Sequence, residues 1–154
     1  HTISVGAASP QDFDRHLKAI ELLPQAIDLI EPVHQRLRRP AEDALGPEWM
    51  ATWHVGLPSW QDTPGEINLP VLLWLHNLLE AWDLQSFATA RYRLLGQGGH
   101  WFVGSNADCF DDQVSASDLQ AVLADSPWRA KIPLVLAQLK QRLAGDSQKR
   151  LTSL

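Results

Sequence analysis

The sequence of 154 residues has very little cysteine, little charge and no long hydrophobic run. Its single cysteine, Cys109, excludes a disulfide framework within the chain and any zinc site built from four cysteines. The longest apolar run covers residues 69–75, far short of the ~20 residues that a membrane span needs. With 45% hydrophobic and 20% charged residues, the composition excludes a disordered chain, a collagen-like repeat and a long coiled coil. A globular domain with a hydrophobic core is therefore expected.

Tyrosine and phenylalanine are also scarce, with 1 and 4 residues, whereas the chain holds 7 tryptophans. A buried aromatic side chain removes roughly 150–250 Å² of surface from water. Seven tryptophans therefore predict either an unusually aromatic core or a surface at which a partner binds. Core packing is the commoner fate of an aromatic side chain.

Basic side chains are nearly absent from the middle of the chain. Residues 40–128 hold twelve carboxylates, two basic side chains and all seven tryptophans, whereas residues 1–39 are neutral and residues 129–154 carry a net charge of +5. An acidic, tryptophan-rich segment suits a cationic partner through Coulomb attraction and cation–π contacts, and it repels the phosphates of nucleic acids. The basic C-terminal segment either touches an anionic surface or pairs with the acidic middle of the same molecule.

The predicted fold class is mostly α: a compact helical domain of about five to six helices, several of them started by proline, with at most one small β-hairpin near residues 100–114. The clearest helix covers residues 69–82, and a second one follows after a very short connection. The pair predicts an αα-hairpin near residues 69–95. One side of the first helix is expected to face the core, through Val71, Trp74, Leu75, Leu78 and Trp82.

Proline and capping residues predict where several helices begin and end. The Ser-Pro pair at residues 9–10 is typical of a helix start. Ser115 and Asp118 have the spacing of a capping box. We expect Pro32 to kink or break the second helix and Pro40 to end it.

The final helix is expected to begin after the Ser-Pro pair at residues 126–127 and to end near Gly145. The domain organisation predicted is therefore a single helical domain over residues 1–145 and a frayed C-terminal tail over residues 146–154. The chain begins at His1 without a signal-peptide pattern, so we expect a trimmed chain, a tag remnant or an excised domain. A cytoplasmic location is expected, and the oligomeric state is left open.

Signals for catalysis, cofactors and metals are weak. Cys109 lies among carboxylates, which raise the pKa of a thiol and work against a nucleophile. The glycine-rich stretch 96–99 lacks the pattern of a phosphate-binding loop. About as many pairs of histidine and carboxylate as chance predicts, roughly three, stand at helical spacing: Asp12 and His16, Glu31 and His34, His76 and Glu80. We predict no metal site, no cofactor and no catalytic residue.

The leading hypothesis is a non-enzymatic protein-interaction module, such as an adaptor, a chaperone-like protein or an inhibitor. It would recognise a basic or partly basic protein segment through the acidic, tryptophan-rich surface, and nucleic acid is not expected as a partner. The predicted partner-binding residues are two tryptophans and three aspartates: Trp60, Trp101, Asp108, Asp111 and Asp112.

The alternative is a small-molecule-binding domain or an enzyme whose pocket is lined by tryptophan and histidine. The residues expected in such a pocket are Trp53, His54, Trp74, His76 and His100. A deep cavity in which two of the histidines converge with a carboxylate would favour this alternative. A third hypothesis, a polyanion mimic, needs a continuous stripe of acids, and their uneven spacing argues against it.

Overall fold

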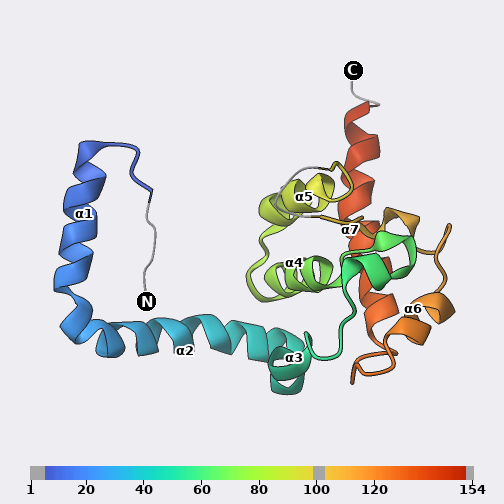
Figure 1. Cartoon of the computed structure of the whole chain (residues 1–154), viewed down its shortest axis with the longest axis horizontal. Helices are drawn as coiled ribbons and strands as arrows, with labels where there is room; N and C mark the ends of the chain where they lie inside the picture. Colours follow the sequence, from blue (N-terminus) through green and yellow to red (C-terminus); the bar gives the residue numbers. More distant parts are fainter. Residues whose placement is uncertain (1–5, 99–102, 152–154) are drawn as a thin grey trace. The chain divides into compact units, whose positions relative to one another are not determined.

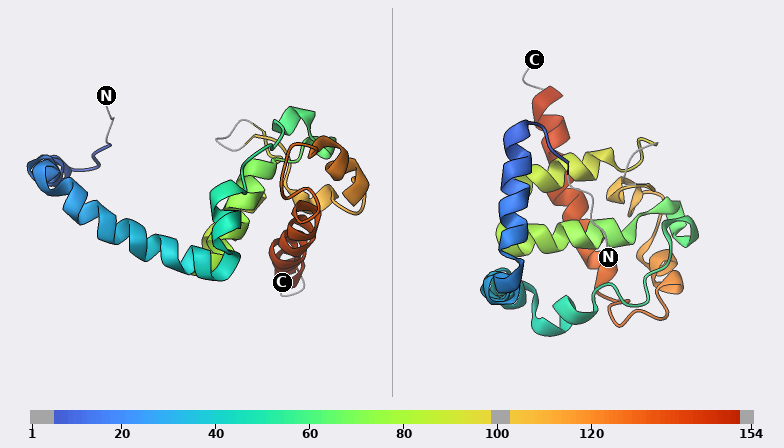
Figure 2. Two further views of the ribbon diagram at one scale, coloured as in Figure 1. Left: turned by 90° about the horizontal axis from the view of Figure 1, so that it is seen from below. Right: turned by 60° about the vertical axis from the view of Figure 1, so that its left-hand side comes forward.

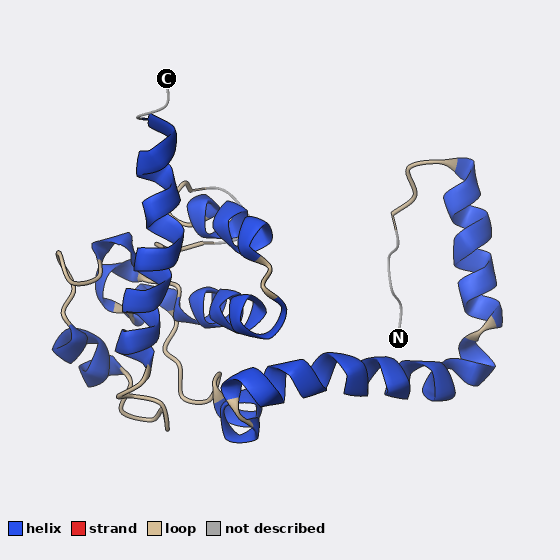
Figure 3. Ribbon diagram, turned by 180° about the vertical axis from the view of Figure 1, so that it is seen from behind, coloured by secondary structure: helices blue, strands red, loops and turns tan. Residues whose placement is uncertain are grey.

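The computed structural model describes residues 6–98 and 103–151, and within these ranges all regular structure is helical (Figure 1). Seven α-helices and four short 3-10 helices are present in this part of the chain, which confirms the predicted fold class (Figure 3). The β-hairpin expected near residues 100–114 lies partly outside the described residues. In the part that is described there are only isolated bridges, between Ile67 and Ser105 and between Phe110 and Val114.

The chain divides into two compact units, residues 1–39 and residues 40–154. The first unit contains α1 (Pro10–Glu21) and η1 (Leu23–Gln25), and the division falls within α2 (Ala26–Leu45). A compact unit need not fold alone. The prediction of one domain over residues 1–145, followed by a tail over residues 146–154, is therefore not decided by this division.

Capping at the start of α1 agrees with the sequence pattern, whereas the end of α2 does not. The Oδ2 atom of Asp12 accepts a hydrogen bond from the Ser9 backbone N–H at 2.9 Å. The prediction that Pro40 ends the second helix is wrong, because α2 continues to Leu45. A proline removes one backbone hydrogen bond, and residues 41–45, with alanine, glutamate and leucine, have the propensity to carry the helix onward.

The second unit is built around an αα-hairpin, as predicted. Helices α4 and α5 pack against each other, and α7 crosses and contacts both (Figures 1 and 2). Asp83 adopts a left-handed conformation, with φ of 49°, and ends α4 so that the chain reverses direction there. The helices of this unit beyond α2 are α3 (Pro47–Thr52), α4 (Leu69–Trp82), α5 (Gln85–Leu94), α6 (Ala116–Val122) and α7 (Ile132–Leu151).

Helix α4 is buried on more sides than its amphipathic pattern predicts. Of the residues expected to face the core, Leu75 is buried, but Val71, Trp74, Leu78 and Trp82 are only half-buried. The reason is that α4 packs against α5 and α7 at once, and a helix enclosed in this way is apolar on most of its circumference. The buried positions include Leu72, Leu73, His76, Asn77 and Leu79.

Two distant loops are joined by backbone hydrogen bonds, and this junction positions the site described below. Ser105 donates its N–H to the Glu66 carbonyl at 2.8 Å, and Asn68 donates its N–H to the Ser105 carbonyl at 3.0 Å. The approach is close enough to need glycine at position 104, where φ is +79° and an added Cβ would lie 2.8 Å from the Glu66 carbonyl oxygen. The loops contain η2 (Trp60–Asp62), η3 (Pro64–Glu66) and η4 (Ala107–Cys109).

Helix α7 starts and ends later than the sequence predicts, at Ile132 and Leu151. Basic side chains on α7 form ion pairs with carboxylates from the acidic middle of the chain. Arg142 forms ion pairs with Glu80 at 2.9 Å and Asp83 at 3.2 Å, and Lys140 pairs with Asp112 at 2.7 Å. The sequence left open whether the basic segment touches an anionic surface or pairs within the molecule. Two of its cations, Lys140 and Arg142, pair within the molecule.

Among the described residues, no helix combines the length and the apolar character that crossing a membrane requires.

Candidate functional site

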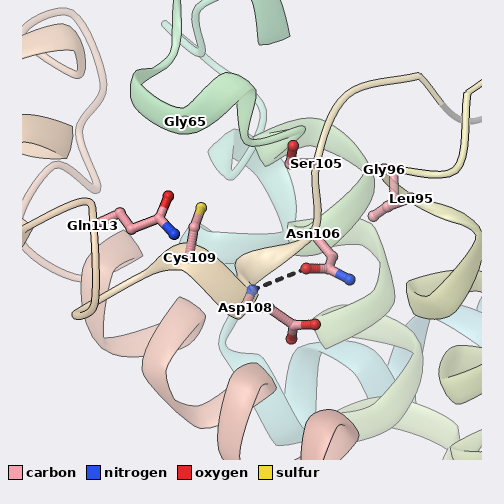
Figure 4. A pocket seen from close by; sticks show the side chains of 8 residues that line it. All are labelled: Gly65, Leu95, Gly96, Ser105, Asn106, Asp108, Cys109 and Gln113. Carbon is pink, nitrogen blue, oxygen red and sulfur yellow. Dashed lines mark hydrogen bonds between the residues drawn. The ribbon is translucent and has the colours of Figure 1, made fainter.

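A cleft of about 400 Å³ opens where the loop containing η3 meets η4 and the end of α5 (Figure 4). We refer to it as the Asp108 cleft. Its lining is polar and apolar in about equal parts and is drawn from segments far apart in the sequence. Besides the C-terminal end of α5, it comprises Gly65, Ser105, Asn106, Asp108, Cys109 and Gln113.

Asp108 is held by hydrogen bonds on two sides. Its backbone N–H donates to the Asn106 side-chain oxygen at 2.9 Å, which is the cap of η4 (Figure 4). Its Oδ1 accepts the Tyr92 hydroxyl proton at 2.6 Å. Burial raises the pKa of Tyr92, and the hydrogen bond and charge of Asp108 raise it further, so the hydroxyl stays protonated and acts as a donor.

The Asp108 carboxylate is nevertheless available to a ligand. Asp108 is exposed, and it forms no ion pair with any residue in the part of the chain that the structure describes. Tyr92 therefore fixes the orientation of the carboxylate without neutralising its charge. A fixed anion of this kind lowers the ordering cost of binding a cation.

Cys109 lines the same cleft as a half-buried free thiol. Burial is the main cause that raises the pKa of this thiol, and the charges of Asp108 and Asp112 act in the same direction. Figure 4 shows the thiol extending toward η3, where Gly65 lies. A thiol that stays protonated at neutral pH is a poor nucleophile.

The structure brings most of the predicted partner-binding residues to one region. Asp111 and Asp112 are exposed in the turn that follows η4, although Asp112 already pairs with Lys140. Trp60 is half-buried, and its Cβ lies 3.1 Å from the position of an added Cβ at Gly104, next to the cleft-lining Ser105. Trp101 lies outside the described residues.

The tryptophans contribute more to packing than to the open surface. Trp49 is buried, and its indole N–H donates to Asn77 Oδ1 at 2.7 Å. Trp128 packs edge to face on Trp49 and donates to Thr52 Oγ1 at 3.0 Å. Of the six tryptophans in the described ranges, none is exposed, and five are half-buried: Trp53, Trp60, Trp74, Trp82 and Trp128.

A second cleft of about 250 Å³ lies between the end of α2, α4 and α7, and its polar lining includes His76, Glu80 and Lys131. The pKa of His76 is lowered to about 4, mainly by burial; the charge of Glu80 opposes this shift, and the charges of Lys131 and Arg142 add to it. The imidazole is therefore neutral at pH 7. The Lys131 ammonium lies 4.2 Å from the ring centroid of Trp49 in a cation–π contact.

The residues predicted for a small-molecule pocket do not gather around this cleft. His54 is exposed, and its ring contacts Trp53 with centroids 5.5 Å apart. Trp53 and Trp74 line neither of the two clefts described here. His100 lies outside the described residues. Within the described ranges, no group of three or more histidine, cysteine or carboxylate side chains is placed to hold a metal ion.

Sequence reasoning missed several residues that shape the two clefts. Tyr92 is the only tyrosine, and a buried tyrosine hydroxyl needs a partner. Nothing in the sequence, however, indicates that this partner is Asp108, 16 positions away. Lys131 stands out in the sequence only as a member of the basic segment, because its contact with Trp49 depends on how the chain folds back.

No family model matches the chain, and neither a curated protein nor a solved structure is similar enough to it to count as a match.

Proposed function

We propose that this chain is a non-enzymatic protein-interaction module that binds a basic segment of a partner protein at the Asp108 cleft. The observation that carries the proposal is an exposed carboxylate, Asp108, oriented by Tyr92 in a cleft of about 400 Å³. A lysine or arginine of the partner would supply the cation that this carboxylate lacks among the described residues. Adaptor, chaperone-like and inhibitor roles all use such recognition.

The charge around the cleft supports a basic partner. Asp111 is exposed close to Asp108, and residues 40–128 carry a net charge of −10. Lys140 and Arg142 offset only part of this charge, through the ion pairs described above. The remaining negative field favours encounter with a cationic segment and disfavours nucleic acid.

The rest of the lining suits a peptide better than a reaction. Ser105, Asn106 and Gln113 offer hydrogen-bonding groups to a bound backbone, and two glycines, Gly65 and Gly96, allow close approach. The raised pKa of Cys109 leaves its thiol protonated. A free thiol of this kind is compatible with a reducing compartment, and we propose the cytoplasm as the location.

Binding of a synthetic peptide tests the proposal. The probe is a fluorescein-labelled peptide of alternating lysine and glycine, with a glutamine–glycine peptide as its neutral counterpart. The D108N/D111N double variant should weaken binding of the lysine peptide by at least about tenfold, measured by fluorescence anisotropy. Both substitutions preserve the fold, because the amide oxygen of an asparagine at position 108 would still accept the Tyr92 proton and asparagine tolerates the positive φ of 66° at position 111.

The matched control is D43N/D125N, which removes two exposed carboxylates of the same unit away from the cleft. It should change the affinity less than about twofold, apart from a small long-range effect that salt suppresses. Equal weakening by both double variants would contradict the proposal, because it would show a non-specific response to net charge. Equal affinity for the lysine and glutamine peptides would contradict it as well.

The alternative, a small-molecule-binding domain or enzyme, is supported only by the second cleft. There a neutral His76 and Glu80 line one surface. The second histidine that this alternative requires is not supplied by His54, which is exposed elsewhere. We therefore favour the interaction module.

A further inference from the structure

The second cleft, between the end of α2, α4 and α7, contains polar groups that the proposed function does not use. We refer to it as the His76 cleft. All residues that line it belong to the compact unit of residues 40–154, so its geometry is set within that unit. The polar side chains in the lining are His76, Glu80, Lys131 and Gln138.

His76 is a buried polar side chain without a hydrogen-bond partner. Its exposed fraction is 6%, and no hydrogen bond or ion pair joins its ring to another residue in the described part of the chain. Neither ring nitrogen is sealed from the surface, so a molecule in the cleft can reach them. Buried polar groups are ordinarily hydrogen-bonded, because an unpaired one costs free energy. A ligand in the cleft would supply the missing partner.

Lys131 brings a cation to the same cleft without a carboxylate to pair with. Its half-buried ammonium lies 4.2 Å from the ring centroid of Trp49 and 5.2 Å from that of Trp128. Among the residues that the structure describes, none forms an ion pair or a hydrogen bond with this side chain. The two indole rings hold the ammonium in place through cation–π contacts, and its N–H groups remain available to an acceptor.

The charges near His76 favour an anionic ligand. Three charged side chains act on its pKa: Glu80, Lys131 and Arg142. Glu80 is already paired with Arg142 at 2.9 Å, whereas Lys131 has no carboxylate partner in the described ranges. The charge left to a ligand is therefore the single positive charge of Lys131.

The remaining lining favours an organic anion over an inorganic one. Leu45, Leu134 and Val135 give the cleft an apolar wall, and Leu134 is 64% exposed. A phosphate ion would leave this wall in contact with water, whereas a hydrocarbon chain would cover it. The volume of about 250 Å³ lies below the roughly 300–1,000 Å³ of sites for drug-sized molecules. A small ligand with one negative charge and a short apolar chain matches both features.

We propose that the His76 cleft binds a small free monocarboxylate with a short, branched hydrocarbon chain. The carboxylate accepts hydrogen bonds from the Lys131 ammonium and from the N–H of the His76 imidazole, and the chain packs against Leu134 and Val135. This inference goes beyond peptide binding at the Asp108 cleft and does not rest on it, since the two clefts share no lining residue. It adds a ligand site to the interaction module and involves no reaction.

Titration of the full chain with isovalerate, followed by NMR, tests the proposal. The readout is the proton–carbon signal of the His76 Cε1–H group, identified by its absence from the spectrum of H76Q. Isovalerate should shift this signal with a dissociation constant of about 1 mM or lower. The signal of His54, which is exposed and does not line the cleft, should stay in place. Isovaleramide, an uncharged molecule of the same shape, should bind at least about tenfold more weakly.

Substitutions separate the roles of the cation and the apolar wall. K131Q should weaken isovalerate binding at least about tenfold. The matched control R129Q removes a cation two positions away that does not line the cleft, and it should change the affinity less than about twofold. L134S should weaken binding of isovalerate and leave binding of acetate, which lacks the chain, unchanged. All seven tryptophans lie in residues 40–128, so their fluorescence checks that each variant is folded.

Results on wild type alone can overturn the proposal, so it remains testable even if K131Q does not fold. Equal affinity for isovalerate and isovaleramide would show that the charge is not recognised. Tighter binding of inorganic phosphate would identify a different anion. Tighter binding of acetyl-glycyl-leucine would identify the carboxyl end of a peptide as the source of the carboxylate.

Two further results would place the ligand elsewhere. One is isovalerate binding that leaves the His76 signal in place, and the other is equal weakening by K131Q and R129Q. The D108N/D111N variant should bind isovalerate as wild type does, because neither substitution touches the His76 cleft. Failure of this proposal and failure of peptide binding at the Asp108 cleft are therefore distinguishable.

Discussion

At the scale of single residues, burial shifts the pKa values of Tyr92 and His76 strongly from their ordinary values. Tyr92 has a raised pKa and donates to a carboxylate, whereas burial beside Trp49 lowers the pKa of His76 to about 4. The first arrangement serves the proposed site, because it orients an anion. The second affects stability, because an unfolded chain returns the histidine to its ordinary pKa of about 6.5.

His76 should make the protein less stable in mild acid. Between pH 6.5 and about 4 the unfolded chain binds a proton at this residue and the folded chain does not, so stability falls as the pH falls through this range. Relative to H76Q, wild type should lose about 2 kcal/mol of additional unfolding free energy between about pH 7.5 and about pH 5. Urea denaturation at the two pH values measures the difference.

The matched control is H54Q, which alters an exposed histidine and should retain the wild-type dependence on pH. An H76Q variant that loses as much stability as wild type over the same range would show that His76 is not the residue responsible.

At the scale of elements, short 3-10 helices and turns shape the Asp108 cleft more than the α-helices do. Element η3 contains Gly65 at φ of +67°, a conformation that L side chains rarely adopt. An added Cβ there would lie 2.9 Å from both Cys109 Sγ and Val114 Cγ2. Position 65 thus requires glycine for its backbone conformation and for the space beside η4.

Replacing this glycine separates the two requirements. G98A serves as the control, because Gly98 has φ of +64° but nothing within 4 Å of an added Cβ. Both variants should suffer backbone strain of about 1 kcal/mol, and G65A should lose a further 1–3 kcal/mol, roughly, from overpacking. Thermal unfolding followed by circular dichroism measures both losses. Equal losses would show that the contact with Cys109 and Val114 relaxes without cost.

At the scale of the whole molecule, the segregation of charge along the sequence is partly cancelled by folding. Arg142 on α7 contacts both ends of the α4–α5 turn, with Glu80, Asp83 and Gln85 each within hydrogen-bonding distance. Lys140 donates a hydrogen bond to Asp112 in the turn that follows η4. The carboxylates outside these ion pairs include Asp108 and Asp111, and we propose that the partner binds there.

The Arg142 network should contribute modestly to stability, since its side chains are exposed to solvent. R142Q should lower the unfolding free energy by less than about 1 kcal/mol at low salt, and added salt should shrink the loss. R129Q, which removes an exposed guanidinium outside this network, should leave stability nearly unchanged. Urea denaturation at two salt concentrations checks this. A loss for R142Q that is independent of salt would indicate lost packing instead of lost charge pairing.

Local patterns in the sequence predicted the helical class, the hairpin of α4 and α5, the helix start at Ser9 and the capping box at Ser115. Such signals depend on residues three or four positions apart, so they are readable in one dimension. The same local reasoning failed at Pro40, where propensity of the following residues carried α2 onward.

Which charged and aromatic side chains contact one another depends on the tertiary fold. Asp108 contacts Tyr92, Arg142 pairs with Glu80 at a separation of 62 residues, and Trp128 donates to Thr52 at a separation of 76. These contacts depend on how α7 and the loops pack against the hairpin of α4 and α5. The spacing of residues within one helix does not predict that packing. The chain is acidic and rich in tryptophan, and among the described residues folding leaves no tryptophan fully exposed while Asp108 stays exposed. The reason is that burial of apolar area is non-directional, whereas the placement of each charge is set by the backbone that carries it.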